Sequence, residues 1–231
     1  MKSSVLYDII EAGVGKRDLI TTISRKMKRD MVDFFSFDKA RKYHCLEFGF
    51  WRGHTTHILS HLFKTVIAID INDGSKIIPE VLERDNVEFI YPRDVYDSNP
   101  DNVWRMLKSA DFTNFTADHD RVIKSTYPKF NVFFIDCVHD TPHIQKDINN
   151  CLIVADLSKV VYFIIDDYGT TLDNNTIKNW HGSINQYIRD LVIRTSNFEV
   201  STYVGEDVGY EYSRDREPLK DREGIILKWQ M

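Results

Sequence analysis

From Tyr43 onward, short runs of apolar residues alternate with longer amphipathic segments. The apolar runs are continuous, as expected for strands that are covered on both faces. They are 44–48, 65–70, 87–91, 131–136 and 160–166. Segments with helical spacing lie at 55–63, 76–82, 101–108, 142–154 and 176–193. This alternation predicts a mostly parallel sheet whose strands are joined by right-handed helical crossovers.

The two ends of the chain depart from this alternation. The last apolar runs, 198–204 and 224–229, have only a charged loop between them, which predicts a hairpin with an antiparallel strand at one edge. Residues 1–42 carry apolar positions at helical spacing. We predict one domain, with a helical cap over 1–42 and an α/β core over 43–231. Three roles are predicted for the N-terminal helices: a cap over a substrate pocket, a homodimer face, or packing on the edge of the sheet.

Composition and charge narrow the class of protein. A chain of 231 residues with 42% hydrophobic residues supports a sizeable core. Its net charge of −5 argues against nucleic acid as a partner, and the basic cluster at 25–29 is expected to be a solvated helix face. Cys45, Cys137 and Cys151 form neither a disulfide framework nor a zinc spacing. With no visible signal peptide or membrane span, we expect a cytoplasmic protein that does not bind membranes.

The segment 45–56, CLEFGFWRGHTT, and the run 66–70, VIAID, form the most informative unit of the chain. They predict a strand, a glycine turn, a helix start and a second strand that ends in an acid. Glycines let the backbone approach a ligand closely, and Asp70 is placed to accept ribose hydroxyls. The spacing E-x-G-x-x-x-G-x-T differs from the G-x-G-x-x-G of dinucleotide enzymes. We therefore predict a nucleoside site of another kind.

Two further predicted strands end in acidic residues. Asp136 follows one of them, and Asp166 and Asp167 follow the other. Because the carboxyl ends of parallel strands meet at one edge, these carboxylates are expected to converge beside the glycine turn. Carboxylates at close range repel unless a cation neutralises them, and oxygen ligands favour Mg²⁺ or Mn²⁺. We predict such a metal site; the alternative is that one or more of these acids caps a helix or binds a backbone N–H.

The glycine turn resembles the cofactor loop of class I S-adenosylmethionine (SAM) methyltransferases. The motifs I-D-x-x-H at 135–139 and I-D-D-Y at 165–168 resemble the metal-dependent sugar O-methyltransferases of the macrocin type, and the broader group related to cephalosporin hydroxylase. The likeness spans about 43–168 and rests on motifs. It implies a three-layer Rossmann-like fold with a mostly parallel, seven-stranded sheet and a C-terminal antiparallel hairpin.

The resemblance also implies how SAM is held. Glu47 would lie near the cationic sulfonium, Asp70 would hold the ribose, and Asp94 would contact the adenine. The glycine turn and the start of the following helix would face the methionine part. The cofactor-binding residues implied are Glu47, Gly49, Gly53, Thr55, Asp70 and Asp94.

A catalytic base is implied in the same way. In the macrocin-type pattern, the histidine three residues after the metal aspartate is the base, and His139 holds that place after Asp136. The metal would lower the pKa of an acceptor hydroxyl, and His139 would take its proton. Many relatives have a glycine and an acid where this chain has Cys137 and Val138, so an acidic base is absent there.

Aromatic and histidine residues near the strand ends are candidates for contact with the acceptor. The candidates are Tyr168, Trp180, His181 and His143. Trp180 and His181 also fit a helix start around a buried tryptophan, and His143 also fits a surface position. His139 and His143 have the spacing of a zinc pair, but no third ligand accompanies them. His57 and His61 are expected on a helix surface.

These observations predict a SAM- and Mg²⁺-dependent (or Mn²⁺-dependent) O-methyltransferase that acts on a sugar hydroxyl, in a deoxysugar or a glycan. Its expected partners are a small-molecule or glycan substrate and a second copy of the chain in a homodimer. The alternatives are a phenolic or other small natural product as acceptor, a nucleotide-binding module without catalysis, and iron-dependent hydroxylation.

Overall fold

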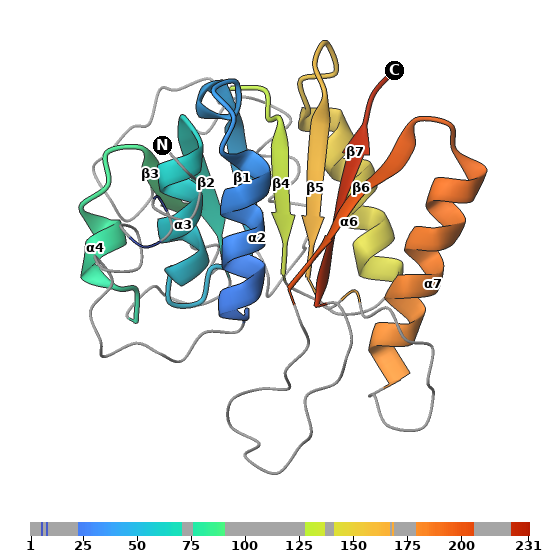
Figure 1. Cartoon of the computed structure of the whole chain (residues 1–231), viewed down its shortest axis with the longest axis horizontal. Helices are drawn as coiled ribbons and strands as arrows, with labels where there is room; N and C mark the ends of the chain where they lie inside the picture. Colours follow the sequence, from blue (N-terminus) through green and yellow to red (C-terminus); the bar gives the residue numbers. More distant parts are fainter. Residues whose placement is uncertain are drawn as a thin grey trace, which may run out of the picture.

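The computed structural model describes residues 6, 8, 23–70, 76–90, 128–136, 141–166, 168, 179–205 and 223–231. In this part of the chain, seven strands form one sheet with helices on both faces (Figure 1). The strand order is β3-β2-β1-β4-β5-β7-β6. The order reverses between β1 and β4, which is the place where ligands bind in open parallel sheets.

The sheet follows the predicted apolar runs closely. The strands are β1 (His44–Phe48), β2 (Thr65–Ile69), β3 (Val87–Ile90), β4 (Val132–Ile135), β5 (Val161–Ile165), β6 (Phe198–Val204) and β7 (Gly224–Trp229). The first five strands pair in parallel, and β7 pairs antiparallel with both β5 and β6. The predicted fold class, a mostly parallel seven-stranded sheet with an antiparallel C-terminal hairpin, is confirmed.

Helices cover the two faces of the sheet. They are α2 (Arg25–Phe35), η1 (Ala40–Lys42), α3 (His54–Leu62), α4 (Pro79–Leu82), α6 (Thr141–Val154) and α7 (Asn179–Arg194). Figure 1 shows α2 and α3 on one face and α6 on the other, with α7 beside it. The helix predicted over 76–82 begins only at Pro79, because proline suits the first turn of a helix. The helix predicted over 101–108 lies outside the described residues.

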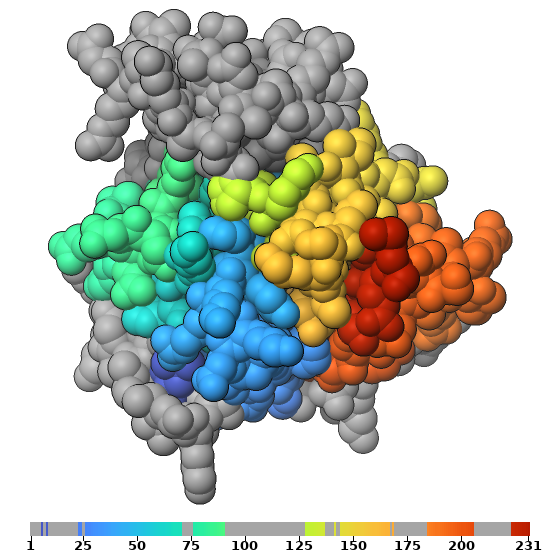
Figure 2. Space-filling view, turned by 90° about the horizontal axis from the view of Figure 1, so that it is seen from above, coloured from blue at the N-terminus to red at the C-terminus, as the bar shows by residue number. Residues whose placement is uncertain are grey.

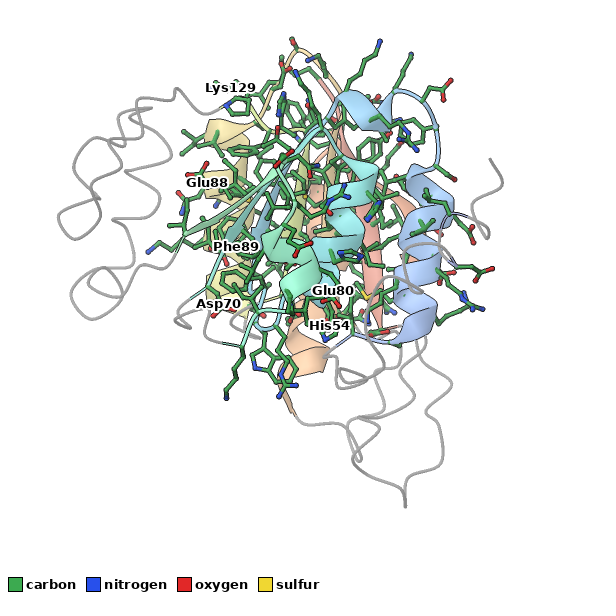
Figure 3. The ribbon with its side chains drawn as sticks, turned by 90° about the vertical axis from the view of Figure 1, so that its left-hand side faces the viewer. His54, Asp70, Glu80, Glu88, Phe89 and Lys129 are labelled. Carbon is green, nitrogen blue, oxygen red and sulfur yellow. The ribbon has the colours of Figure 1, made fainter. Side chains whose placement is uncertain are left out.

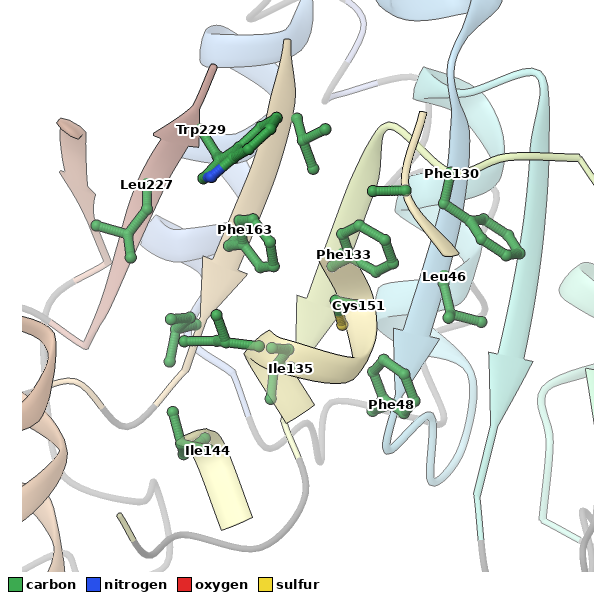
Figure 4. Close-up of a cluster of buried hydrophobic side chains, with 14 of the residues drawn as sticks. Leu46, Phe48, Phe130, Phe133, Ile135, Ile144, Cys151, Phe163, Leu227 and Trp229 are labelled. Atoms are coloured by element: carbon green, nitrogen blue, oxygen red, sulfur yellow. The ribbon is translucent and has the colours of Figure 1, made fainter. Parts of the chain in front are cut away.

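The core on the α6 and α7 face is aromatic near its centre. The rings of Phe133 and Phe163, from the neighbouring strands β4 and β5, stack with their centroids 5.3 Å apart. Cys151 from α6 and Leu227 from β7 belong to the same buried cluster (Figure 4). Because β4 and β5 bury both faces, their sequences are continuous apolar runs rather than alternating ones.

Helix α2 forms part of the layer on the opposite face. Its residues Met27, Met31 and Phe35 are buried against the sheet and α3. Lys28 is also buried, with 2% exposure, so the predicted solvated face at 25–29 is wrong at this position. Helical spacing identifies the most apolar side of α2, but neighbouring segments cover more of the helix than that side alone. Helix α2 packs on a face of the sheet, in one cluster with residues of β1, β4 and β5. A cap over a substrate pocket and a homodimer face stay predictions.

Helix α3 is more deeply buried than its sequence suggests. His57 is 5% exposed, so its predicted place on a helix surface is wrong, whereas His61 is only partly buried. Both faces of α3 are covered, one by the sheet and the other by neighbours that include α2 and α4. Partial burial and the nearby Arg84 lower the pKa of His61 to about 4.

The order of elements is visible across the whole molecule. Figure 2, seen from above, shows green segments of α4 and β3 at one side and the red and orange C-terminal elements at the other, in keeping with the strand order. Cys45 and Cys151 are buried and form no disulfide within the described part of the chain, whereas Cys137 lies outside it. Within the described ranges, no helix combines the length and apolarity needed to cross a bilayer.

Candidate functional site

Acidic residues follow three of the parallel strands, β2, β4 and β5, at the carboxyl edge of the sheet, the lower edge in Figure 1. The Asp70 N–H donates to the Ile90 carbonyl at 3.3 Å, the Asp136 N–H to Phe48 at 2.9 Å, and the Asp166 N–H to Ile135 at 3.1 Å. These bonds extend the parallel ladders by one residue beyond β2, β4 and β5. The structure therefore brings Asp70, Asp136 and Asp166 to one edge of the sheet, and Asp70 and Asp136 follow the two strands that flank β1 and its turn.

The turn between β1 and α3 depends on two glycines. Gly49 and Gly53 have φ values of 84° and 81°, a left-handed conformation that residues with a Cβ rarely adopt. The Gly49 N–H donates to the Ile69 carbonyl at 2.8 Å, which fastens the start of the turn to the end of β2. The Gly53 N–H donates to the Phe50 carbonyl at 2.6 Å, which closes the turn just before α3.

Gly53 is also required by packing. A Cβ at this position would lie 2.9 Å from Val81 Cγ1 and 3.3 Å from Ile77 Cγ2. The Ile78 N–H donates to the Arg52 carbonyl at 3.0 Å, so the segment that leads into α4 is bound directly to the turn. Gly53 therefore serves both the conformation of the turn and the close approach of the α4 segment.

The most unusual residue of the turn is Trp51. Its φ of 43° is positive, and no other non-glycine residue among those described has a positive φ. Its N–H donates to Asp70 Oδ2 at 2.7 Å, and Asp70 is only 8% exposed. The Arg52 guanidinium lies 4.7 Å from the centroid of the Trp51 ring. Sequence reasoning did not assign Trp51, and its place between two turn glycines was the one available signal.

Figure 3 shows where the side chains of this region lie. Asp70 and Phe89 lie near each other toward the carboxyl edge, and His54, at the start of α3, lies close to Glu80 of α4. Lys129, which precedes β4, lies toward the opposite end of the sheet. The Phe50 ring, from the glycine turn, meets Phe89 edge to face with centroids 4.9 Å apart. Asp70 therefore lies near the paired aromatic rings of Phe50 and Phe89.

Glu47 is a fully buried carboxyl within β1. Neither of its oxygens has a hydrogen-bond partner among the described residues; the Thr56 hydroxyl lies near but falls short of hydrogen-bond geometry. Burial, with smaller contributions from the nearby carboxylates Asp136 and Asp70, raises the pKa of Glu47 to about 8, against a lowering influence from Thr56. A cation bound near Glu47 would favour its ionised form.

Thr55 lies in the first turn of α3 and is 6% exposed. Gly53 is the N-cap residue and offers no side-chain cap, and the first intrahelical bond runs from the His57 N–H to the Gly53 carbonyl at 2.8 Å. The N-terminus of α3 thus adjoins the glycine turn, as the sequence predicted. Its role in holding a ligand stays a prediction.

The predicted metal ligands are only partly described. Asp136 is half-buried and Asp166 is 5% exposed, and they follow the paired strand ends Ile135 and Ile165. Asp167 lies outside the described residues. Among the residues that the structure does describe, no three histidine, cysteine or acidic side chains gather as a metal site. The three-aspartate site therefore stays a prediction, with two of its members at neighbouring strand ends.

The remaining predicted site residues are described in part or not at all. Asp94 and His139, like Asp167, lie outside the described residues. His143 falls in the first turn of α6, and Trp180 and His181 in the first turn of α7, but their side chains are not described. Their roles stay predictions.

Tyr168 is described and fully buried, with 1% exposure. Its N–H donates to the Glu223 carbonyl at 2.8 Å, and its ring lies 5.7 Å from that of Tyr203. Burial raises the pKa of its phenol, against a lowering influence from a hydrogen bond with Arg189. The ring belongs to the core on the α6 and α7 face, and contact with an acceptor stays a prediction.

Comparisons with known proteins agree on the fold. No protein-family model matches the chain, and no curated protein matches its sequence significantly. An O-methyltransferase from Bacillus cereus in complex with S-adenosylhomocysteine (SAH) matches with a TM-score of 0.58 and 14% identity, over 100% of this chain and 90% of that one. The O-methyltransferase TomG from Streptomyces achromogenes, involved in tomaymycin synthesis and in complex with SAM, matches with a TM-score of 0.52 and 12% identity, over 99% and 96%.

An rRNA methylase from Streptococcus thermophilus also matches, with a TM-score of 0.50 and 14% identity, over 91% of this chain and 100% of that one. At these identities, the matches establish a shared architecture: the chain has the Rossmann-like fold of methyltransferases. The acceptors of these neighbours differ in kind, so the fold does not select an acceptor.

Proposed function

We propose that the protein is a SAM-dependent methyltransferase that transfers the methyl group to a hydroxyl oxygen. The observation that carries this proposal is the Asp70 carboxylate, which lies at the end of β2 and accepts the Trp51 N–H at 2.7 Å. An acid fixed beside a glycine turn, at the carboxyl edge of a parallel sheet, suits the two hydroxyls of a ribose. The fold shared with SAM- and SAH-bound methyltransferases supports the same ligand.

The charge of the site favours a cationic ligand. The carboxylates of Asp136 and Asp70 contribute to the raised pKa of Glu47, and Glu47 is buried without a hydrogen-bond partner among the described residues. SAM carries a sulfonium and an ammonium group, either of which would stabilise these carboxylates. In this proposal Gly49, Gly53 and Thr55 line the methionine part, and Asp94 contacts the adenine.

For the acceptor side, we propose Mg²⁺ or Mn²⁺ held by Asp136, Asp166 and Asp167. The donor set fits, because Asp136 and Asp166 offer carboxylate oxygens at neighbouring strand ends. A bound metal would act as a Lewis acid toward the acceptor hydroxyl. His139 would take the hydroxyl proton, and Tyr168, Trp180, His181 and His143 would line the acceptor pocket. A sugar hydroxyl is the proposed acceptor, with a phenolic or other small natural product as the alternative.

The donor part is tested by calorimetric titration of SAH into the full chain. We expect the wild type to bind, and Asp70→Asn to lose roughly 10-fold to 100-fold in affinity, the range for a hydrogen bond to a charged group. Asp85→Asn is the matched control, because Asp85 is an exposed aspartate just before β3, at the other end of the sheet. Undetectable SAH binding by the wild type would refute the proposal.

The acceptor part is tested with methyl-labelled SAM and parallel panels of deoxysugars, glycans and phenols. Metal-stripped protein is assayed in EDTA, with Mg²⁺ or Mn²⁺ added back, and the assay is repeated without oxygen. We expect transfer to a sugar only when metal is present, with or without oxygen. Full turnover in EDTA would exclude the metal, dependence on oxygen would favour a hydroxylase, and SAH binding without any transfer would favour a non-catalytic module.

A further inference from the structure

The conformation of Trp51 is not explained by its own preference. Its φ of 43° lies in the left-handed region, which a bulky residue enters only when its surroundings impose it. Glycine would be the default residue for such a position, and this turn already uses glycine at Gly49 and Gly53. The chain therefore keeps a strained residue in the middle of the turn.

Hydrogen bonds hold the backbone of both residues next to Trp51, Phe50 and Arg52. The Phe50 carbonyl accepts the Gly53 N–H at 2.6 Å, and the Arg52 carbonyl accepts the Ile78 N–H at 3.0 Å. The Arg52 guanidinium also lies over the Trp51 ring. These contacts leave the peptide before Trp51 little freedom to rotate, which accounts for the persistence of the left-handed conformation.

This conformation directs a donor at the ligand site. The Trp51 N–H points to Asp70 Oδ2 at 2.7 Å, which joins the turn after β1 to the end of β2. A hydrogen bond from a backbone N–H to a carboxylate is strong and directional. It fixes the rotation of the Asp70 carboxylate, the group that the proposed function assigns to the ribose hydroxyls.

We propose that Trp51 is a positioning residue for Asp70, and that it acts through its left-handed backbone rather than through its ring. This inference rests on the proposed function, since it concerns how SAM or SAH is recognised. It predicts that selectivity for the ribose diol depends on the conformation available at position 51. A residue that leaves the left-handed region would release Asp70, and ligand binding would then have to restore the hydrogen bond.

The test compares variants at position 51 that differ in their tolerance of a positive φ. Trp51→Gly and Trp51→Asn accept this conformation without the indole ring, whereas Trp51→Val resists it strongly. SAH and its 2′-deoxyribose analogue are titrated into each full-length variant, and the ratio of the two dissociation constants measures ribose selectivity. Thermal melting of each variant reports on folding separately.

We expect Trp51→Gly and Trp51→Asn to keep SAH affinity within about threefold of the wild type, with the selectivity ratio retained. Trp51→Val should lose roughly tenfold in SAH affinity and most of the selectivity, as Asp70→Asn does. Equal losses in the glycine and valine variants, or an unchanged ratio in Trp51→Val, would overturn the inference. If Trp51→Val does not fold, the SAH affinity and selectivity ratio of Trp51→Gly test the inference, and a loss of either in this variant would overturn it. Failure of the wild type to bind SAH would instead overturn the proposed function itself.

Discussion

Glu47 is the residue whose protonation most directly links the site to stability. Burial raises its pKa to about 8 in the folded protein, whereas an unperturbed glutamate titrates near 4.5. Between these pH values, the folded state holds a proton that the unfolded state has released. The free energy of unfolding therefore falls as pH rises across this window, by up to about 1.4 kcal/mol per pH unit from this residue alone.

The Glu47→Gln variant isolates this effect, because glutamine keeps the shape of the side chain and does not titrate. Urea unfolding is measured between pH 5 and pH 9 for the wild type, for Glu47→Gln and for the exposed control Asp85→Asn. We expect Glu47→Gln to gain stability relative to the wild type as pH rises, levelling above about pH 8. Parallel stability curves for the wild type and Glu47→Gln would show that Glu47 titrates normally in the folded protein.

Gly53 allows a second test at the same scale. Gly53→Ala combines a φ of 81° with a Cβ placed 2.9 Å from Val81 Cγ1. We expect it to lower the free energy of unfolding by about 1–3 kcal/mol, and the α4 segment to lose protection from hydrogen exchange. Glu83→Ala, an exposed change just after α4, should stay within about 0.5 kcal/mol of the wild type. Equal stability of the two variants would contradict the tight packing at Gly53.

At the scale of elements, the strands were the most predictable part of the chain. Strands β1, β6 and β7 have the predicted bounds, because their apolar runs end sharply at polar or turn residues. Burial of helices was less predictable: Lys28 and His57 are covered by neighbouring elements that local spacing does not reveal. The conformation of Trp51 was beyond prediction, since it opposes the residue's own preference and becomes apparent only when the turn meets β2.

Helix α2 gives the prediction at this scale. Met31 is completely buried between the helix and the sheet, whereas Asp33 on the same helix is exposed. We expect Met31→Ala to lower the free energy of unfolding by about 2–5 kcal/mol, as other large-to-small core changes do. Asp33→Ala should stay within about 0.5 kcal/mol of the wild type. If urea titration gave equally small losses of unfolding free energy for Met31→Ala and Asp33→Ala, α2 would not be an integral layer of the fold.

At the scale of the whole molecule, the strand order decides where a ligand can be held. Strands β1 and β4 adjoin at the point where the order reverses, and the glycine turn and Asp136 follow them. The sequence indicated the donor side through the glycine spacing and Asp70. The acceptor side is less well defined, because motif spacing places Asp136 and Asp166 at strand ends but says little about the segments that would complete a pocket around them.

The most direct measurement of the central claim is a crystal structure of the full chain grown with saturating SAH. The account predicts SAH at the carboxyl edge beside Gly49 and Gly53, with its ribose hydroxyls on the Asp70 carboxylate and the Trp51 N–H still bound to Asp70. Fully occupied SAH elsewhere on the molecule, or a ribose with no contact to Asp70, would contradict it.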